Sequence, residues 1–222
     1  MSKIVFDEVG KKIYESGVDR GVLYVVDETG EYGNGVPWNG LTNITESPSG
    51  AEATPLYAGN SKYLNLYSAE EFGASIEAYT YPDEFEACDG SAELAVGVTV
   101  GQQSRSTFGL SYRTMLGNDT LSEKFGYKIH LIYGCKAAPS EKAYATINDS
   151  PEAITFNWEL TTTPVQIEGL KPTATVTINS TKVNAAKLTA LEEMLYGSAS
   201  KEPKLPTPQE LITLFGTGTL AK

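Results

Sequence analysis

The chain has 222 residues, of which 41% are hydrophobic and 10% aromatic, enough for one well-buried core in a β-rich domain. Its 28 acidic and 17 basic residues give a net charge of −11, which disfavours binding to DNA phosphates or anionic lipid. No apolar run approaches the roughly 18 residues of a membrane span. The start, MSKIVFDEVGKK, lacks the apolar core of a secretory signal. We therefore expect no membrane insertion and synthesis that finishes in the cytoplasm.

The first predicted strand is VLYVV, residues 22–26, and a long excursion from Asp27 to Asn60 follows it. This excursion is rich in glycine and proline and has little sustained periodicity, although it contains the compact run VPWNGLTNI. A loop of this length is uncommon in a compact domain. We expect it either to have a function of its own or to be ordered by a partner.

Most of the remaining chain shows strand patterns separated by glycine, proline and Asn/Asp clusters. Apolar residues alternate with polar ones in three segments, forming the rows Phe108, Leu110, Tyr112; Tyr127, Ile129, Leu131, Tyr133; and Ile154, Phe156, Trp158, Leu160. Further predicted strands are SIEAYTY (75–81), ELAVGVTV (93–100), KAYATI (142–147) and TATVTIN (173–179). Several antiparallel strands with turns between them predict a sandwich or barrel rather than a βαβ sheet.

Two short helices are predicted near the C-terminal end. In NAAKLTALEEMLYG, Asn184 can cap the start and Gly197 follows the last turn. In TPQELITLFG, Thr207 and Glu210 make a capping box. The linker between them, SASKEPKLPTP, predicts that the last helix reaches away from the body. We expect a β-rich body over residues 1–197 and a terminal arm over 198–222.

The cysteines and the histidine give little support to catalysis. Cys88 and Cys135 are the only cysteines, and so few in a chain without an export signal predict buried, reduced thiols. His130, the only histidine, lies in an alternating strand, where packing is the favoured role. Zinc-binding spacings, a nucleophile elbow and phosphate-binding loops are missing from the sequence.

The stretch IEAYTYPDEFEACDG, residues 76–90, concentrates five carboxylates in a block without any lysine or arginine between residues 63 and 104. A calcium loop counted from Asp83 fails, because Phe85 and Ala87 occupy positions that need oxygen ligands. Spacing alone leaves open a glycosidase pair with Tyr79, Tyr81 and Phe85 as a sugar platform. The favoured interpretation is a strand ended by Pro82 and followed by solvated turn residues.

Several stretches between residues 17 and 165 together carry a family resemblance. They are GVDRGVLYVVD, YGNGVPWNGLTNITESPSGAEATPLYAGNSKYLNL, EEFGASIEAYTYPDEFEACDG, FGLSYRT and YKIHLIYGCKAAPSEKAYATINDSPEAITFNWELTTTPV. The most specific parts are the run from Trp38 to Ile44 and the pair YTYPDEF and WELTTTPV. On these residues the chain resembles the major tail tube proteins of phages with long, non-contractile tails (siphophages) that infect Gram-positive bacteria.

The resemblance implies a mainly β, antiparallel sandwich or barrel-like tail tube fold with a flanking α-helix and extended arms. It also implies assembly rather than catalysis, with no cofactor: six subunits form a ring by pairing strands, and the rings stack into a tube through which double-stranded DNA leaves the capsid without specific binding. The implied partners are other copies and the tape-measure, tail terminator and distal tail proteins. The implied location is the virion tail, assembled in the host cytoplasm.

Two sets of residues are candidates for roles in such a tube. Carboxylates lining the channel would repel DNA and let it slide, and side chains of the loop and the last helix would contact neighbouring subunits. The candidate lumen-facing acids are Glu77, Asp83, Glu84, Glu86 and Glu159. The candidate intersubunit contacts are Trp38, Asn39, Leu41, Leu211, Leu214 and Phe215.

Two alternatives stay open from the sequence. The acids could lie on the outer surface and only keep the protein soluble. An acidic β-sandwich with exposed aromatic residues could also be a carbohydrate-binding or adhesion module of a phage or surface structure.

Overall fold

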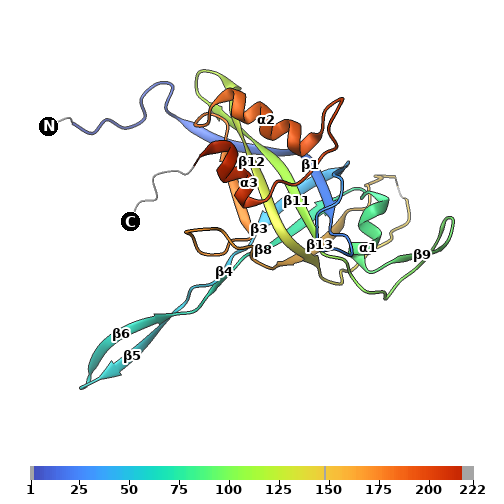
Figure 1. Ribbon diagram of the computed structural model, residues 1–222, viewed down its shortest axis with the longest axis horizontal. Coiled ribbons are helices and arrows are strands. Elements are labelled where there is room, and N and C mark those ends of the chain that lie inside the picture. Colours follow the sequence, from blue (N-terminus) through green and yellow to red (C-terminus); the bar gives the residue numbers. More distant parts are fainter. Residues whose placement is uncertain (1–2, 148, 217–222) are drawn as a thin grey trace.

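The computed structural model describes residues 3–147 and 149–216 and shows a mainly β protein with short helices (Figure 1). The strands are β1 (Ile13–Val25), β2 (Val36–Pro37), β3 (Leu41–Glu46), β4 (Ser49–Gly50), β5 (Ala53–Ala58), β6 (Ser61–Tyr67), β7 (Glu70–Glu71), β8 (Gly73–Ala78), β9 (Ala92–Ala95), β10 (Val98–Val100), β11 (Phe108–Asn118), β12 (Ser122–Ala137), β13 (Phe156–Thr162) and β14 (Thr175–Asn179). The helical segments are η1 (Asp83–Phe85), α1 (Glu86–Asp89), α2 (Ala185–Tyr196) and α3 (Pro208–Phe215).

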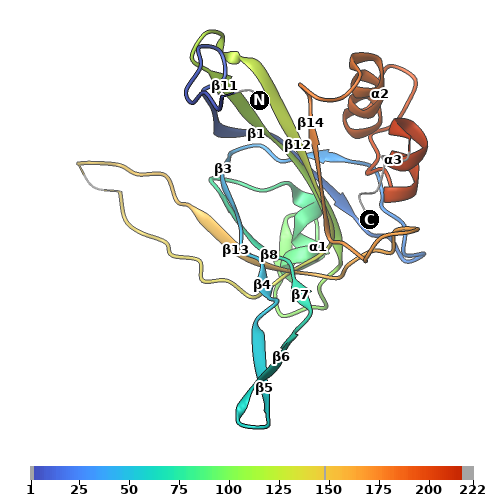
Figure 2. The same ribbon diagram turned by 90° about the vertical axis from the view of Figure 1, so that its left-hand side faces the viewer.

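The main sheet is antiparallel and bends over itself into a sandwich. Its strand order is β2-β1-β11-β12-β13-β8-β3, and β14 also pairs with β12. Long strand β12 pairs with β14 through residues 128–132 and with β13 only through residues 135–137, so β12 joins the two halves. Figure 2 shows three layers: β3, β8 and β13, then β1, β11, β12 and β14, then α2 and α3. The predicted antiparallel β-sandwich is confirmed.

The first core lies between the two sheet layers. Two of the predicted apolar rows enter it, with Phe108, Leu110 and Tyr112 from β11 facing Trp158 and Leu160 from β13. Segment η1–α1 adds Phe85, which is fully buried against the ring of Trp158 at a centroid distance of 5.0 Å. The cysteines Cys88 and Cys135 are free and buried here, as predicted.

The second core lies between the β1-β11-β12-β14 layer and the helices. The predicted row Ile129, Leu131 and Tyr133 faces Leu191 and Leu195 of α2. Both predicted helices are confirmed at their caps: the Asn184 side chain accepts hydrogen bonds from the first turn of α2, and Thr207 and Glu210 form the capping box of α3.

The linker before α3 does not carry this helix away from the body, so the prediction of a projecting arm is wrong for residues 198–216. Leu205 and Leu211 are buried in the second core, and the Tyr133 hydroxyl donates to the Pro206 carbonyl oxygen at 2.8 Å. The apolar face of α3 removes more hydrocarbon from water on the sheet than it would on an extended arm. Residues 217–222 of the predicted arm lie outside the described residues.

A β-bulge at Gly134 lets β12 serve both cores. Ile132 points into the first core and Tyr133 into the second, and beyond the bulge Cys135 and Ala137 point into the first core again. Gly134 has φ +60°, and a Cβ atom there would lie 2.4 Å from the Thr163 carbonyl oxygen. A glycine is therefore required where the strand shifts its register.

Some predicted elements differ in the structure. Residues 93–100 form a hairpin, β9–β10, because the chain turns at Gly97, which has φ +74°. Residues 142–147 form no strand and have no strand partner among the described residues; Tyr144 and Ile147 are exposed. The predicted strand at 75–81 ends at Ala78. The excursion from Asp27 to Asn60 is not one loop, because β2 and β3 belong to the main sheet.

Candidate assembly surfaces

The outward face of β3, β8 and β13 is a continuous polar surface. Two cross-strand rows cover it: Asn157, Glu77 and Asn43, and next to them Glu159, Ser75 and Thr45. Glu77 and Glu159 are diagonal neighbours, which in an antiparallel pair lie roughly 7–8 Å apart. The three strands contain no lysine or arginine. Lys136 of β12, opposite Thr161, lies beside Glu159 at the margin of this face. The three strands themselves contribute only negative charge to the polar face, while Ile76 and Trp158 on the reverse side fill the first core.

The structure separates the five candidate lumen acids into two groups. Glu77 and Glu159 share the polar face. Asp83, Glu84 and Glu86 instead lie on η1–α1, which inserts Phe85 into the first core and so packs on the opposite side of β8 and β13. Asp83 and Glu84 are exposed and Glu86 is half-buried.

The fifth carboxylate of the acidic stretch, Asp89, has a structural role. It is buried and accepts a hydrogen bond from Trp158 Nε1 at 3.0 Å. Lys142 Nζ lies 2.5 Å from it and Arg105 3.7 Å. Arg105 and Lys142 both lie outside residues 63–104, the block without lysine or arginine. Contacts between distant segments therefore supply the positive charge that the local sequence lacks. The ion pair also anchors the loop that leads to β13.

The β13-β8-β3 unit has an unpaired strand edge on each side. In β13, only Leu160–Thr162 pair with β12, which leaves the edge at Phe156–Glu159 without a strand partner among the described residues. The Ala138 amide donates to the Glu159 carbonyl oxygen, and because antiparallel residues alternate in direction, the backbone groups of Asn157 point to the same side. On the other side, β3 is the last strand of the sheet order. The Ser47 amide donates to Gly73, so by the same alternation the backbone groups of Ile44 point outward.

Hairpin β5–β6 projects from the body as a two-stranded arm (Figure 1). Its turn residues Gly59 and Asn60 have φ +58° and +62°, the left-handed pair of a type I′ turn. One face carries Leu56, Leu64 and Leu66, and alternation places the tyrosines 57, 63 and 67 on the other. The leucines are 39–54% exposed and the tyrosines 69–72% exposed. A hairpin that leaves apolar groups on both faces in water is typical of a surface that a partner covers.

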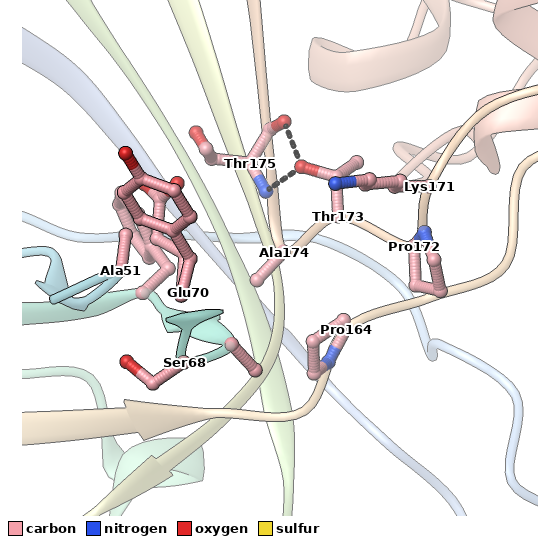
Figure 3. Close-up of a pocket in the computed structure, with 12 residues that line it drawn as sticks. Ala51, Ser68, Glu70, Pro164, Lys171, Pro172, Thr173, Ala174 and Thr175 are labelled. Atoms are coloured by element: carbon pink, nitrogen blue, oxygen red, sulfur yellow. Dashed lines mark hydrogen bonds between the residues drawn. The ribbon is translucent and has the colours of Figure 1, made fainter. Parts of the chain in front are cut away.

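A pocket of about 640 Å³ opens at the base of this hairpin. Figure 3 shows the two segments at the base of the hairpin, with Ala51 and with Ser68 and Glu70, on one side and the segment from Lys171 to Thr175, with Pro164, on the other. Its walls are mainly small apolar groups, with one carboxylate and one ammonium group. Tyr67 belongs both to this pocket and to the tyrosine face, so the pocket and the hairpin form one surface.

The predicted intersubunit contacts from the loop lie mostly in the chain's own core. Trp38 is buried against Phe85 and Trp158, and its indole N–H donates to the Thr80 carbonyl oxygen at 3.0 Å. Leu41 packs against the same cluster, and only Asn39 is exposed. The intersubunit assignment of Trp38 is therefore corrected, because its surface is already buried inside the subunit. Leu41 is half-buried and packs on the same core.

The three candidates from the last helix also face inward. Leu211 is buried in the second core, and Leu214 and Phe215 pack against it as half-buried residues. The helix closes the sandwich of its own chain with Leu211, while Leu214 and Phe215 keep part of their surface exposed.

The three aromatic residues that the sequence offered as a sugar platform, Tyr79, Tyr81 and Phe85, do not form one exposed surface. Phe85 is fully buried and Tyr81 half-buried, with rings stacked edge to face in the first core, while Tyr79 is exposed. Among residues 3–147 and 149–216, no three His, Cys, Asp or Glu side chains converge on a point that could hold a metal ion. Within the same residues, no helix has the length and hydrophobicity needed to span a bilayer.

His130 joins three strands in a polar cluster at the edge of the first core. Its ring stacks on Tyr112 at 4.7 Å, and its two nitrogens lie 3.7 Å from a Glu15 carboxylate oxygen and 3.5 Å from a Glu46 one. Hydrogen bonds from His130 and Tyr112 lower the pKa of Glu46 although partial burial opposes this. Burial alone would raise the pKa of Glu15, but hydrogen bonds from Lys128 and Thr114 lower it. His130 is a packing residue, as predicted.

These shifts predict a loss of stability in acid. A carboxylate whose pKa is lowered by folding stabilises the folded state above its ordinary pKa of 4.5 and loses that contribution as the pH falls through the lowered value. We expect Glu46→Gln to lower the free energy of unfolding at pH 7, and the difference from the original protein to shrink between pH 5 and about pH 3. Urea unfolding at these pH values measures the effect, with exposed Glu52→Gln as the control. A difference that does not change with pH would contradict this origin.

The fold and surfaces define a three-layer, antiparallel β-sandwich with a polar face between two unpaired strand edges and an apolar hairpin arm. No known protein family and no curated protein matches the sequence. Among solved structures, the chain shows a similarity to one chain of an extracellular contractile injection system, the PVC sheath-tube complex in its extended state. The TM-score is 0.32 and the identity 11%, over 72% of this chain and 88% of that one. A similarity of this extent does not establish a shared function.

Proposed function

We propose that this protein is a structural subunit of a virion tail tube, in which six copies form a ring and stacked rings form the conduit for double-stranded DNA. One observation carries the proposal. The three-stranded unit β13-β8-β3 has a polar face without lysine or arginine on its strands, and it has an unpaired strand edge on each side. The resemblance of residues 17–165 to siphophage tail tube proteins supports it. The role is assembly rather than catalysis, with the tape-measure, tail terminator and distal tail proteins as further partners.

The two unpaired edges form the contact between neighbouring subunits of the ring. An unpaired edge is an aggregation hazard in a monomer, but the edge at Ile44 of one copy can pair with the edge at Asn157 of the next. Each contact joins two different edges, so the copies associate head-to-tail. A constant rotation from one copy to the next then closes them into a ring. Repetition around the ring would join the β13-β8-β3 units into one continuous inner sheet.

The polar face then lines the channel. Duplex DNA carries one negative charge per roughly 1.7 Å of its axis, so lysines on the wall would retain it, whereas Glu77 and Glu159 repel it. Asp83, Glu84 and Glu86 are not assigned to this wall, because they lie on the core side of the same layer. The apolar cores and the helices lie behind the wall (Figure 2).

Negative-stain microscopy of the concentrated protein, or of the protein mixed with the complex that initiates the tail, tests the assembly. We expect rings or tubes with a central channel. Solid fibres without a channel, or a protein that stays monomeric even with the initiating complex, would refute the proposal.

Reversing the charge of Glu77 and Glu159 tests whether these two residues line the channel. In phage that carry Glu77→Lys and Glu159→Lys, we expect tubes to form but DNA ejection in vitro to slow, because the wall now attracts phosphates. Glu77→Gln with Glu159→Gln is the neutral control. Glu28→Lys with Glu31→Lys, both at exposed positions, controls for the same change of net charge. Unchanged ejection from charge-reversed tubes would remove these two residues from the lumen.

The exposed tyrosines of hairpin β5–β6 favour one second candidate, a carbohydrate-binding or adhesion module. Aromatic faces exposed in this way can stack on sugar rings. Binding of glycans by the monomer, lost in Tyr57→Ala and Tyr63→Ala, together with failure to form tubes would favour this candidate.

A further inference from the structure

The two ends of the sandwich differ in charge and in shape. Strand β12 has 16 residues and runs from one end to the other, a length of roughly 50 Å at about 3.3 Å per residue. Segment η1–α1 and hairpin β9–β10 lie at the end where β12 finishes, since the Arg105 guanidinium donates to the carbonyl oxygen of Ala137 and the Ser106 amide to Ala87. The β11–β12 turn and the start of β1 lie at the opposite end (Figure 1).

The first end is acidic and bears a projecting apolar tip. Its acids Asp83, Glu84, Glu86 and Glu93 have no ion-pair partner within the described parts of the chain. Hairpin β9–β10 turns at Val96, which is 97% exposed, and Leu94 beside it is 71% exposed. Glu93 also accepts a hydrogen bond from the Gly97 amide, which fixes its carboxylate at the turn.

The second end holds a small pocket of about 250 Å³ that apolar and polar residues line together. Its apolar lining, called the floor below, consists of Ile13, Tyr14, Leu116 and Phe125. Ile13 is 56% and Tyr14 46% exposed, so the chain itself does not cover these side chains. Its charged lining, called the rim below, consists of Lys128, Lys182 and Glu15, and Asn179 and Thr181 complete the pocket. Lys128 pairs with Glu15, whereas Lys182 has no ion-pair partner among residues 3–147 and 149–216.

We infer that the tip of β9–β10 of one copy enters the pocket between β1, β11, β12 and β14 of the next copy, and that this contact fixes the direction in which rings stack. The pocket is smaller than the roughly 300–1,000 Å³ of small-molecule sites, and suits one or two aliphatic side chains such as Val96 and Leu94. Glu93 at the tip then meets the free ammonium group of Lys182.

Charge complementarity selects a second copy as the occupant. In a protein of net charge −11, most faces repel their equivalents on another copy. The free Lys182 on the rim can receive the acidic end, whereas two acidic ends cannot meet. Donor and acceptor lie at opposite ends of one subunit, so the contact is head-to-tail and propagates along an axis instead of closing into a dimer. This inference rests on the proposed tube, since it names the contact between its rings.

Cross-linking between two variants, each with one added cysteine, tests the contact directly. Val96→Cys and Lys182→Cys are both at exposed positions, and the native Cys88 and Cys135 are buried. In tubes assembled from a mixture of the two, a short bismaleimide should give covalent dimers, while tubes of either variant alone should give none. Tubes that form without this cross-link overturn the inference and leave the tube proposal standing. Failure of the unsubstituted protein to form any tube overturns both.

Charge reversal gives a second, independent measurement. We expect Lys182→Glu to raise the protein concentration needed for tubes by at least about tenfold, because each ring repeats the contact, and Glu93→Lys in the same chain to restore most of it. Lys201→Glu, at an exposed position beyond α2 and away from the pocket and the polar face, is the matched control and should leave assembly unchanged. Equal effects of Lys182→Glu and Lys201→Glu, or tubes that Glu93→Lys does not rescue although circular dichroism shows a folded protein, would overturn the contact.

Discussion

Replacing Asn157 with proline is expected to abolish ring and tube formation while the subunit stays folded. The backbone N–H of Asn157 points to the unpaired edge of β13, and those of its neighbours Phe156 and Trp158 point to β8. Proline removes a donor from the middle of the edge that a neighbouring strand would pair with and leaves the internal ladder intact. Proline is tolerated on strand edges for the same reason, so we expect the free energy of unfolding to change much less than assembly does.

Asn157→Thr is the matched control, because threonine keeps the amide donor and suits a strand. We expect tubes of this variant to look normal by negative-stain microscopy. Circular dichroism and urea unfolding of both variants establish that they are folded. Tubes formed by the proline variant would show that the ring does not close through this edge.

Trp158→Ala is expected to cause the largest loss of stability of any single change considered for this chain. Trp158 is fully buried at the centre of the first core, where its ring meets those of Trp38, Tyr81, Phe85 and Phe156. Removing a buried tryptophan costs about 3–5 kcal/mol, a large part of the roughly 5–15 kcal/mol that holds a domain together. Urea unfolding followed by circular dichroism measures this loss.

Two further variants separate packing from hydrogen bonding. Trp158→Phe keeps most of the ring contacts but loses the indole N–H that donates to Asp89, so we expect a smaller loss of about 1–3 kcal/mol. Tyr63→Ala, at a side chain 72% exposed on the hairpin, should change stability by less than about 0.5 kcal/mol. Comparable losses for Trp158→Ala and Tyr63→Ala would show that the first core is not where the stability lies.

The sequence predicted those strands and helices that depend on residues a few positions apart, through alternation in strands and cap residues in helices. Alternation identified the faces of β11, β12 and β13, and the cap residues Asn184 and Thr207 located α2 and α3. The hairpin β5–β6 was missed, although Gly59-Asn60 between alternating apolar residues is a turn signal. The glycine and proline content of the surrounding stretch favoured one long loop, and this concealed the short strands within it.

Contacts between distant segments were beyond reach of these patterns. The sequence marked Asp89 as one of five unbalanced acids, yet Arg105 and Lys142 neutralise it across the fold. Trp38 and Leu211 were predicted to contact other subunits, but each fills a core of its own chain. A buried side chain and an interface side chain have the same apolar chemistry, so only the position of the surrounding elements distinguishes them.

By itself, the sequence determined the β class, the two faces of each strand and the caps of the last helices, because these depend on neighbours a few residues apart. Only the tertiary structure decided which face is polar and outward, which strand edges remain unpaired, and that Glu77 and Glu159 share a surface that Asp83, Glu84 and Glu86 do not. Strand parity defines two faces but not which one meets water, since that depends on how the layers stack.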